Sequence, residues 1–275
     1  MSVIWLIFCY GFIGATVGSF LNVVIDRVPA GESLLRPPSH CPGCGRRLRP
    51  WELVPVASYL VLRGRCRECG ARIPRRVLAV EAATALFFGA LMAVYGPSGR
   101  LLLATLYSAV LLVLIVIDLE HKLVPNVIVL PAIAVAVLLL PLDNYLPIPP
   151  ERIELLGYWA ELRGIEAASP WALGVASQLL GGVAAFGLFL AVWLASRGGM
   201  GAGDVKLAAF AGLLSGFPGA LATVFGSFIL GGVAGVALLA ARLATRKTAI
   251  PFAPFLAVSA WVMMVFGGAV LRWYG

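Results

Sequence analysis

Runs of about 20 apolar residues, the length that a helix needs to cross a bilayer, recur along the chain. Helices are the expected structure for such runs, because backbone polar groups in lipid must find their hydrogen-bond partners within the protein. The chain is 61% hydrophobic and only 12% charged, which separates it from soluble proteins. We therefore predict an all-α polytopic membrane protein with about eight transmembrane helices. The expected spans are residues 3–25, 77–95, 100–117, 126–142, 172–196, 204–217, 219–240 and 251–271.

Lys and Arg residues are distributed unevenly over the segments that connect these spans. Of the 21, seventeen fall on one side of the membrane, eleven of them between Arg27 and Arg76, and four fall on the other side. Because cytoplasmic loops are enriched in positive charge, residues 26–76 are expected in the cytoplasm and both termini outside. The net charge of +8 is therefore interpreted as a topology signal that also suits anionic membrane lipid, and no nucleic acid is expected as a partner.

The polar segments indicate two domains. Residues 1–95 would hold two spans and a small cytoplasmic loop domain at 26–76, and residues 96–275 would hold the other six spans. Between Pro150 and Pro170, apolar residues at helical spacing indicate a further helix that lies on the outer leaflet.

Four of the five cysteines form two Cys-x2-Cys pairs within the loop domain, separated by 21 residues. The pairs are Cys41 with Cys44 and Cys66 with Cys69, and a glycine follows each pair. Four thiolates in this pattern suit tetrahedral Zn²⁺ and leave no open coordination position, so a structural metal is expected. Disulfide bonds are the alternative. The expected cytoplasmic location argues against them, because thiols there are kept reduced.

Two aspartates lie where spans meet the cytoplasm. Asp118 ends an 18-residue apolar run, and Asp204 follows a glycine-rich stretch that ends in Gly201 and Gly203. Charged side chains near the membrane are costly, so each aspartate is a functional candidate. Two carboxylates at a similar depth are expected to share a proton, as an aspartyl protease requires. The glycines would leave the backbone open to an extended substrate or let the helix begin irregularly.

The alternative for each aspartate is a structural role. Asp118 and Asp204 could cap helices, or pair with the nearby Lys122 and Lys206. The Gly-x-Gly-Asp context, in which Gly201 and Gly203 flank Ala202 just before Asp204, is more specific than capping requires, and it favours the catalytic interpretation.

The segment at 201–206, Gly-Ala-Gly-Asp-Val-Lys, resembles the GxGD signature of intramembrane aspartyl proteases. A wider set of motifs resembles the bacterial type IV prepilin peptidases, which are leader peptidase/N-methyltransferases. In chain order these motifs are GSFLNVVI (18–25), RVP (27–29), CPGCG (41–45), CRECG (66–70), DLEHKLVPN (118–126) and PFAPF (251–255).

This resemblance implies a multi-pass protein of the bacterial inner membrane with its active site at the cytoplasmic face. Asp118 and Asp204 would be catalytic, and Gly201, Gly203 and Lys206 would form the loop around Asp204. The implied partners are prepilins or pseudopilins, cut after a glycine at the end of a basic leader. The implied second activity is methylation of the new N-terminal amine, with S-adenosylmethionine as the methyl donor.

The residues alone do not identify a site for the methyl donor, and a Rossmann-type site is excluded because no soluble αβ domain is predicted. The candidate region is 18–81, where polar side chains gather at the cytoplasmic ends of two spans: Ser19, Asn22, Arg27 and Glu81. These side chains could instead cap helices or pair with one another. Shorter relatives lack a zinc-bearing loop, so the loop favours the bifunctional type.

Three other functions compete with this interpretation. A proton-coupled transporter can also carry buried carboxylates, but it would be expected to show matched half-repeats and a site at mid-membrane. A membrane-anchored zinc-binding adaptor would explain the cysteines and not the GxGD segment. A peptidase without methyltransferase activity is the nearest rival.

Overall fold

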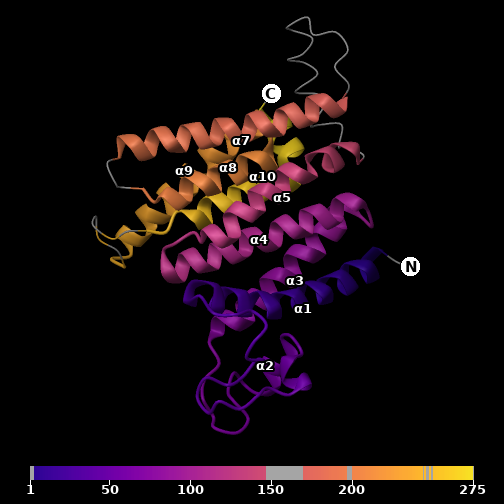
Figure 1. Ribbon diagram of the computed structural model, residues 1–275, viewed down its shortest axis with the longest axis vertical. Coiled ribbons are helices and arrows are strands. Elements are labelled where there is room, and N and C mark those ends of the chain that lie inside the picture. Colours follow the sequence, from indigo (N-terminus) through magenta and orange to yellow (C-terminus); the bar gives the residue numbers. More distant parts are fainter. Residues whose placement is uncertain are drawn as a thin grey trace, which may run out of the picture. The chain divides into compact units, whose positions relative to one another are not determined.

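The computed structural model of the chain describes residues 3–146, 170–196, 200–243, 245, 248 and 250–274. Within these ranges the regular structure is helical (Figure 1), apart from two isolated β-bridges. The helices are α1 Val3–Ala30, the 3-10 helix η1 Pro50–Leu53, α2 Ala57–Val61, α3 Arg75–Tyr95, α4 Gly99–His121, α5 Asn126–Tyr145, α7 Pro170–Ala195, α8 Ala202–Ser215, α9 Gly219–Ala240 and α10 Ala253–Tyr274.

Seven of the described helices are long and apolar enough to cross a membrane, so the chain is a multi-pass membrane protein. They are α1, α3, α4, α5, α7, α9 and α10. Each of the eight predicted spans coincides with a helix. The remaining one, 204–217, corresponds to α8, whose 14 residues are too few to cross a bilayer alone. The helix expected between Pro150 and Pro170 lies outside the described residues.

The chain divides into two compact units, Met1–Val113 and Leu114–Gly275. The domain boundary expected at residue 95 stays a prediction. In unit 1, α1 packs along α3 at two glycines one turn apart. A Cβ at Gly14 would lie 2.5 Å from the carbonyl oxygen of Thr84, and a Cβ at Gly18 would collide with the Thr84 hydroxyl. The glycines therefore let the two helix backbones approach directly.

In unit 2, the short helix α8 is enclosed by α5, α7, α9 and α10. Its side chains from Val205 to Leu214 are mostly buried. A Cβ at Gly181 of α7 would lie 2.5 Å from the carbonyl oxygen of Gly212 in α8, so these two helices also meet backbone to backbone. This packing holds the first turn of α8 in a defined position within unit 2.

Candidate active site and metal centre

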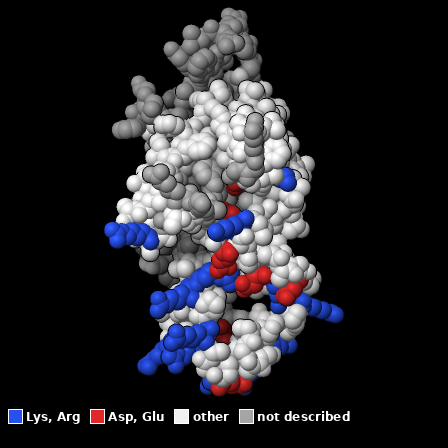
Figure 2. All heavy atoms as spheres, turned by 90° about the vertical axis from the view of Figure 1, so that its left-hand side faces the viewer, with Lys and Arg blue, Asp and Glu red and all other residues white. Residues whose placement is uncertain are grey.

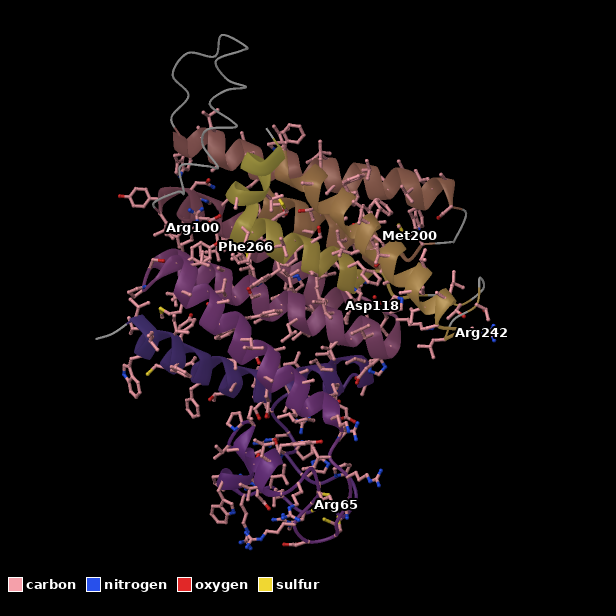
Figure 3. The ribbon with its side chains drawn as sticks, turned by 180° about the vertical axis from the view of Figure 1, so that it is seen from behind. Arg65, Arg100, Asp118, Met200, Arg242 and Phe266 are labelled. Atoms are coloured by element: carbon pink, nitrogen blue, oxygen red, sulfur yellow. The ribbon has the colours of Figure 1, made fainter. Side chains whose placement is uncertain are left out.

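Asp118 occupies the last turn of α4, and only 5% of its surface is exposed. Its Oδ2 atom accepts a hydrogen bond from the backbone N–H of Ala253, at 3.1 Å. Ala253 is the first residue of α10, where backbone N–H groups have no partner within the helix and favour a negative charge. Figure 3 shows Asp118 toward the end of unit 2 that also holds Met200 and Arg242, away from Phe266.

Asp204 lies in the first turn of α8 and is half-buried. Its carboxylate is close enough to that of Asp118 for the two negative charges to interact. The first turn of a helix is also a favourable place for a carboxylate. Unit 2 thus brings together the two aspartates that the sequence analysis singled out, although 85 residues separate them in the chain.

The structural alternative for the aspartates was pairing with Lys122 or Lys206. Within the described residues, neither aspartate forms an ion pair with Lys122 or Lys206. The ammonium group of Lys206 instead donates a hydrogen bond to Oδ1 of Asn126, at 2.8 Å. Lys206 therefore ties α8 to the start of α5, next to the connection that follows Asp118.

The glycines before Asp204 differ in their surroundings. A Cβ at Gly203 would lie 2.8 Å from the Cβ of Val124, so a larger residue would push α8 away from the connection between α4 and α5. A Cβ at Gly201 would meet the carboxylate of Asp204 at 3.5 Å and the backbone nitrogen of Gly203 at 4.0 Å, both ordinary contact distances. Gly203 therefore serves packing, and the more open position is Gly201, just before the helix begins.

The start of α10 is anchored by aromatic side chains. The ring of Phe252 lies 5.8 Å from that of Phe189 in α7 and 5.4 Å from that of Phe228 in α9, measured between centroids. Phe189 is fully buried. This packing fixes the N–H of the next residue, Ala253, against Asp118. Sequence reasoning missed this contact. The prolines of the PFAPF motif could have located the start of the helix, but not its partner.

The four paired cysteines come together in the loop between α1 and α3. All of their Sγ atoms lie within 4.8 Å of one another. The two pairs have the same backbone fold, because the N–H of Cys41 donates to the carbonyl of Arg46 and the N–H of Cys66 donates to that of Ala71. Gly45 and Gly70 close the two turns with φ of +69° and +72°.

The chemistry of this cluster fits a zinc ion. Four sulfur donors at this separation match the ligand number and type of a structural tetrahedral site. The backbone N–H groups of Cys69 and Glu68 lower the pKa of the Cys66 thiol to about 6, whereas burial and the neighbouring sulfurs raise the pKa of Cys69 to about 11, so Cys66 is the thiol of this pair that ionises first. Cys41, Cys44, Cys66 and Cys69 are thus the residues that would hold Zn²⁺.

An arginine joins the two cysteine turns. The guanidinium of Arg46 binds both carboxylate oxygens of Glu52, at 3.1 and 2.8 Å, and Oε1 of Glu68 at 3.1 Å. This guanidinium, together with the backbone N–H of Arg49, lowers the pKa of Glu52 to about 2.

In Figure 2, Lys and Arg side chains gather over this loop at the lower end of the view.

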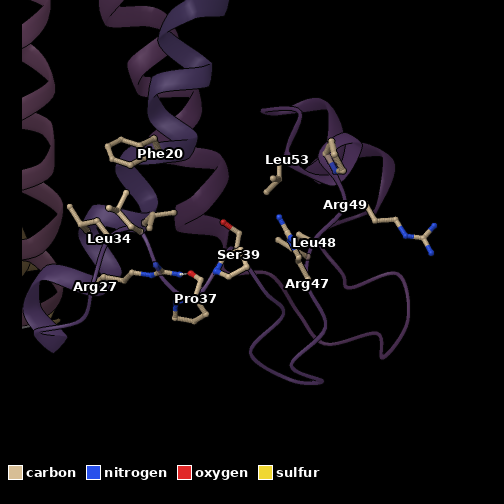
Figure 4. A pocket seen from close by; sticks show the side chains of 13 residues that line it. Phe20, Arg27, Leu34, Pro37, Ser39, Arg47, Leu48, Arg49 and Leu53 are labelled. Atoms are coloured by element: carbon tan, nitrogen blue, oxygen red, sulfur yellow. Dashed lines mark hydrogen bonds between the residues drawn. The ribbon is translucent and has the colours of Figure 1, made fainter.

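The four side chains proposed for methyl transfer line one cavity in unit 1. This cavity has a volume of about 500 Å³ and is bounded by α1, α3 and the cysteine loop, with Ser19, Asn22, Arg27 and Glu81 on its wall. Arg27 also lines a second hollow of about 560 Å³, shown in Figure 4. Its guanidinium donates to the carbonyl oxygens of Ser33 and Pro37, so Arg27 holds the loop in shape.

Comparison with known proteins finds matches along nearly the whole chain. The profile of the Bacterial Peptidase A24 N-terminal domain matches residues 12–95, and that of the Type IV leader peptidase family matches residues 105–236. The prepilin leader peptidase/N-methyltransferase of Pseudomonas aeruginosa is 34% identical over 98% of this chain and 93% of its own length. The protein of the same description from Bacillus subtilis is 34% identical over 98% of this chain and 96% of its own length. No solved structure matches.

Proposed function

Because this chain belongs to the type IV leader peptidase family, we propose that it removes the leader of prepilins or pseudopilins and then methylates the new N-terminal amine. The observation that carries the peptidase half is the approach of Asp118 and Asp204 within unit 2. Two carboxylates that share a proton supply both a base and an acid for peptide hydrolysis.

The surroundings of the two aspartates support different roles for them. Asp118, which is held by the N–H of Ala253 at the start of α10, acts in this proposal as the base that removes a proton from water. The water oxygen then attacks the scissile carbonyl carbon. Asp204 holds the shared proton, polarises the carbonyl oxygen and donates the proton to the leaving amine as the C–N bond breaks. A proton passed back from Asp118 to Asp204 restores the starting state.

The charge distribution supports a cytoplasmic location for this chemistry. The loop between Arg27 and Arg76 carries eleven of the 21 Lys and Arg residues, which supports a cytoplasmic position. The protein would then lie in the inner membrane of a bacterium, with both termini on the outer side of that membrane. Asp118 and Asp204 would act at the cytoplasmic face, where a basic leader is cut after a glycine, ahead of the hydrophobic helix of the substrate.

The loop domain would serve as a zinc-stabilised platform. Zn²⁺ bound by Cys41, Cys44, Cys66 and Cys69 would hold the two cysteine turns together and leave no position open for substrate. The methyl half of the reaction would use S-adenosylmethionine, whose sulfonium supplies an electrophilic methyl group. When bound, this donor would transfer its methyl group to the new N-terminal amine of the substrate, which would lose one proton.

Co-expression of this protein with a prepilin and mass spectrometry of the product test both halves. Loss of the leader reports the peptidase, and the added mass of one methyl group reports the transferase. Cleavage without methylation would restrict the chain to the peptidase half. Absence of cleavage, with the protein correctly inserted in the membrane, would refute the proposal.

A further inference from the structure

A cavity in unit 1 has the size and polarity of a small-molecule site. Its volume of about 500 Å³ lies within the usual range of ligand pockets. Asn22 reaches its wall from α1, Glu81 from α3, and Tyr59 and Leu62 from the loop that carries the cysteines. The cavity is therefore closed on one side by two membrane helices and on the other by the metal-binding loop.

Asn22 presents an unused acceptor at this cavity. The side chain is buried, with 5% of its surface exposed. Its Nδ2 group donates to the carbonyl oxygens of Gly18 and Val77, both at 3.2 Å, and these two bonds fix the orientation of the amide. Its Oδ1 atom has no hydrogen-bond partner among the described residues. A buried acceptor without a donor is destabilising, so a donor from a ligand would remove a real penalty.

Glu81 presents a buried carboxylate on the same wall, with 4% of its surface exposed. Its Oε2 atom accepts a hydrogen bond from the backbone N–H of Val56, at 2.7 Å. Val56 has φ of +60° and ψ of −52°, and the N–H of Ala57 bonds to the carbonyl of Pro55 across it. This γ-turn is strained, above all for a β-branched residue. The bond to Glu81 thus holds a strained turn of the loop at the edge of the cavity.

The carboxylates on the cavity wall differ in whether they are paired. Asp26 pairs with Arg76 at 2.6 Å, and Glu52 pairs with Arg46 at 2.8 Å. Neither Glu81 nor Glu32, which also lines the cavity, has an ion pair within the described part of the chain. Of these two carboxylates only Glu81 is buried, because Glu32 is exposed. A buried carboxylate that lacks a cation attracts one, because its charge is poorly solvated.

The loop side of the cavity carries a net positive charge, because Arg46, Arg67 and Arg72 line it together with Glu32 and Glu52. Arg67 and Arg72 are both exposed. A ligand that fits this arrangement has a cationic group and hydrogen-bond donors for the helix side, and an anionic group for the loop side. S-adenosylmethionine has these features, with a sulfonium, an ammonium, an adenine amine and a carboxylate.

We infer that this cavity is the methyl-donor site, in which Glu81 is the counter-charge to the sulfonium and Asn22 Oδ1 accepts a hydrogen bond from the donor molecule. This inference rests on the proposed methyltransferase activity and adds the location of its site. Glu81 and Asn22 hold the ligand, and Glu81 also joins α3 to the loop. The strained turn at Val56 gives a route by which an occupied cavity orders the loop.

Equilibrium binding tests this assignment without relying on activity. Full-length protein in lipid nanodiscs is titrated with radiolabelled S-adenosylmethionine and, separately, with S-adenosylhomocysteine, which has a neutral sulfur. Glu81→Gln should raise the Kd for S-adenosylmethionine roughly 10- to 100-fold and that for S-adenosylhomocysteine less than about threefold. Asn22→Leu, which keeps the branched shape of the side chain and removes both its acceptor and its Nδ2 donors, should weaken both ligands. Glu120→Gln, in unit 2, is the matched control and should bind as the unaltered protein does.

Prepilin cleavage and zinc content are measured on the same samples to show that each variant is folded. Unchanged binding in both Glu81→Gln and Asn22→Leu, with methylation intact, would overturn the cavity assignment and leave the proposed function standing. Equal weakening of both ligands by Glu81→Gln would overturn the role of Glu81 toward the sulfonium. If the unaltered protein cleaves prepilin but neither binds the donor nor methylates, the methyltransferase half of the proposed function fails as well.

Discussion

The backbone N–H of Ala253 donates a hydrogen bond to the carboxylate of Asp118, 135 residues earlier in the chain, at 3.1 Å. The bond joins the end of α4 to the beginning of α10, so the last helix of the chain sets the charge environment of Asp118. The donor belongs to the backbone, and no change of the side chain at 253 other than to proline removes it.

Asp118→Asn and Asp204→Asn should each lower prepilin cleavage by roughly 10²- to 10⁴-fold, because each removes one partner of an acid–base pair. Glu120→Gln is the matched control, since Glu120 lies two positions after Asp118 on a helix and points elsewhere. Cleavage is followed by gel shift or mass spectrometry in membranes that hold equal amounts of each variant. Near-normal processing by either Asn variant would remove that residue from the catalytic role.

Ala253→Pro should lower the rate of cleavage roughly 10- to 100-fold, because it deletes the hydrogen bond to Asp118. Proline is tolerated at the first position of a helix, so α10 should still form. Ala253→Gly keeps the N–H and should stay within about threefold of the unaltered protein. We expect kcat to fall more than KM changes. Equal rates for the Pro and Gly variants would show that the N–H does not assist Asp118.

Elemental analysis of the purified protein should find about one zinc ion per chain, bound by the four-cysteine cluster. Replacement of Cys41 and Cys44 by Ser should abolish zinc binding and loosen the loop that closes the unit 1 cavity. Methylation should then fall further than cleavage, because both proposed catalytic aspartates lie in unit 2. Cys9, which is outside the cluster, provides the control in Cys9→Ser. Disulfide-linked cysteines and no metal would contradict both the zinc site and its cytoplasmic location.

Reporter fusions should read cytoplasmic when placed at residues 45–70 and external when placed at 150–165. The expectation follows from the seventeen Lys and Arg residues assigned to one side of the membrane and the four assigned to the other. An external signal from a fusion at residue 60 would invert the topology and place the aspartates on the wrong face for a cytoplasmic leader.

The membrane helices could be predicted because each one corresponds to a continuous run of apolar residues in the sequence. Each of the eight predicted spans meets a helix, as for the segment 219–240, which coincides with α9 at both ends. The cysteine cluster was equally accessible, since the spacing of Cys41, Cys44, Cys66 and Cys69 is itself the pattern of a metal site. Asp204 could also be identified from the sequence, because it is the aspartate of the GxGD segment at 201–204.

Contacts between distant backbones were not predictable in the same way. No residue pattern indicates that the N–H of Ala253 meets Asp118, because any residue except proline supplies the same donor. The role of Gly203 was also ambiguous, since a missing side chain can expose the backbone or allow close packing. Because a Cβ at Gly203 would lie 2.8 Å from the Cβ of Val124, the missing side chain allows close packing here. The turn at Val56 runs against the preference of a β-branched residue, so sequence reasoning would have placed it elsewhere.

Gly18 lies against Thr84 where α1 meets α3, and a Cβ there would also stand 2.9 Å from the Cα of Glu81. One added methyl group would therefore shift the helix that carries a proposed ligand contact, without touching the ligand. In genetic terms, Gly18→Ala would behave as a defect in donor affinity and not as a failure of membrane insertion. Thr84→Ala would relieve the defect only in part, because it removes the clash with the Thr84 hydroxyl and leaves the close approach to the Cα of Glu81.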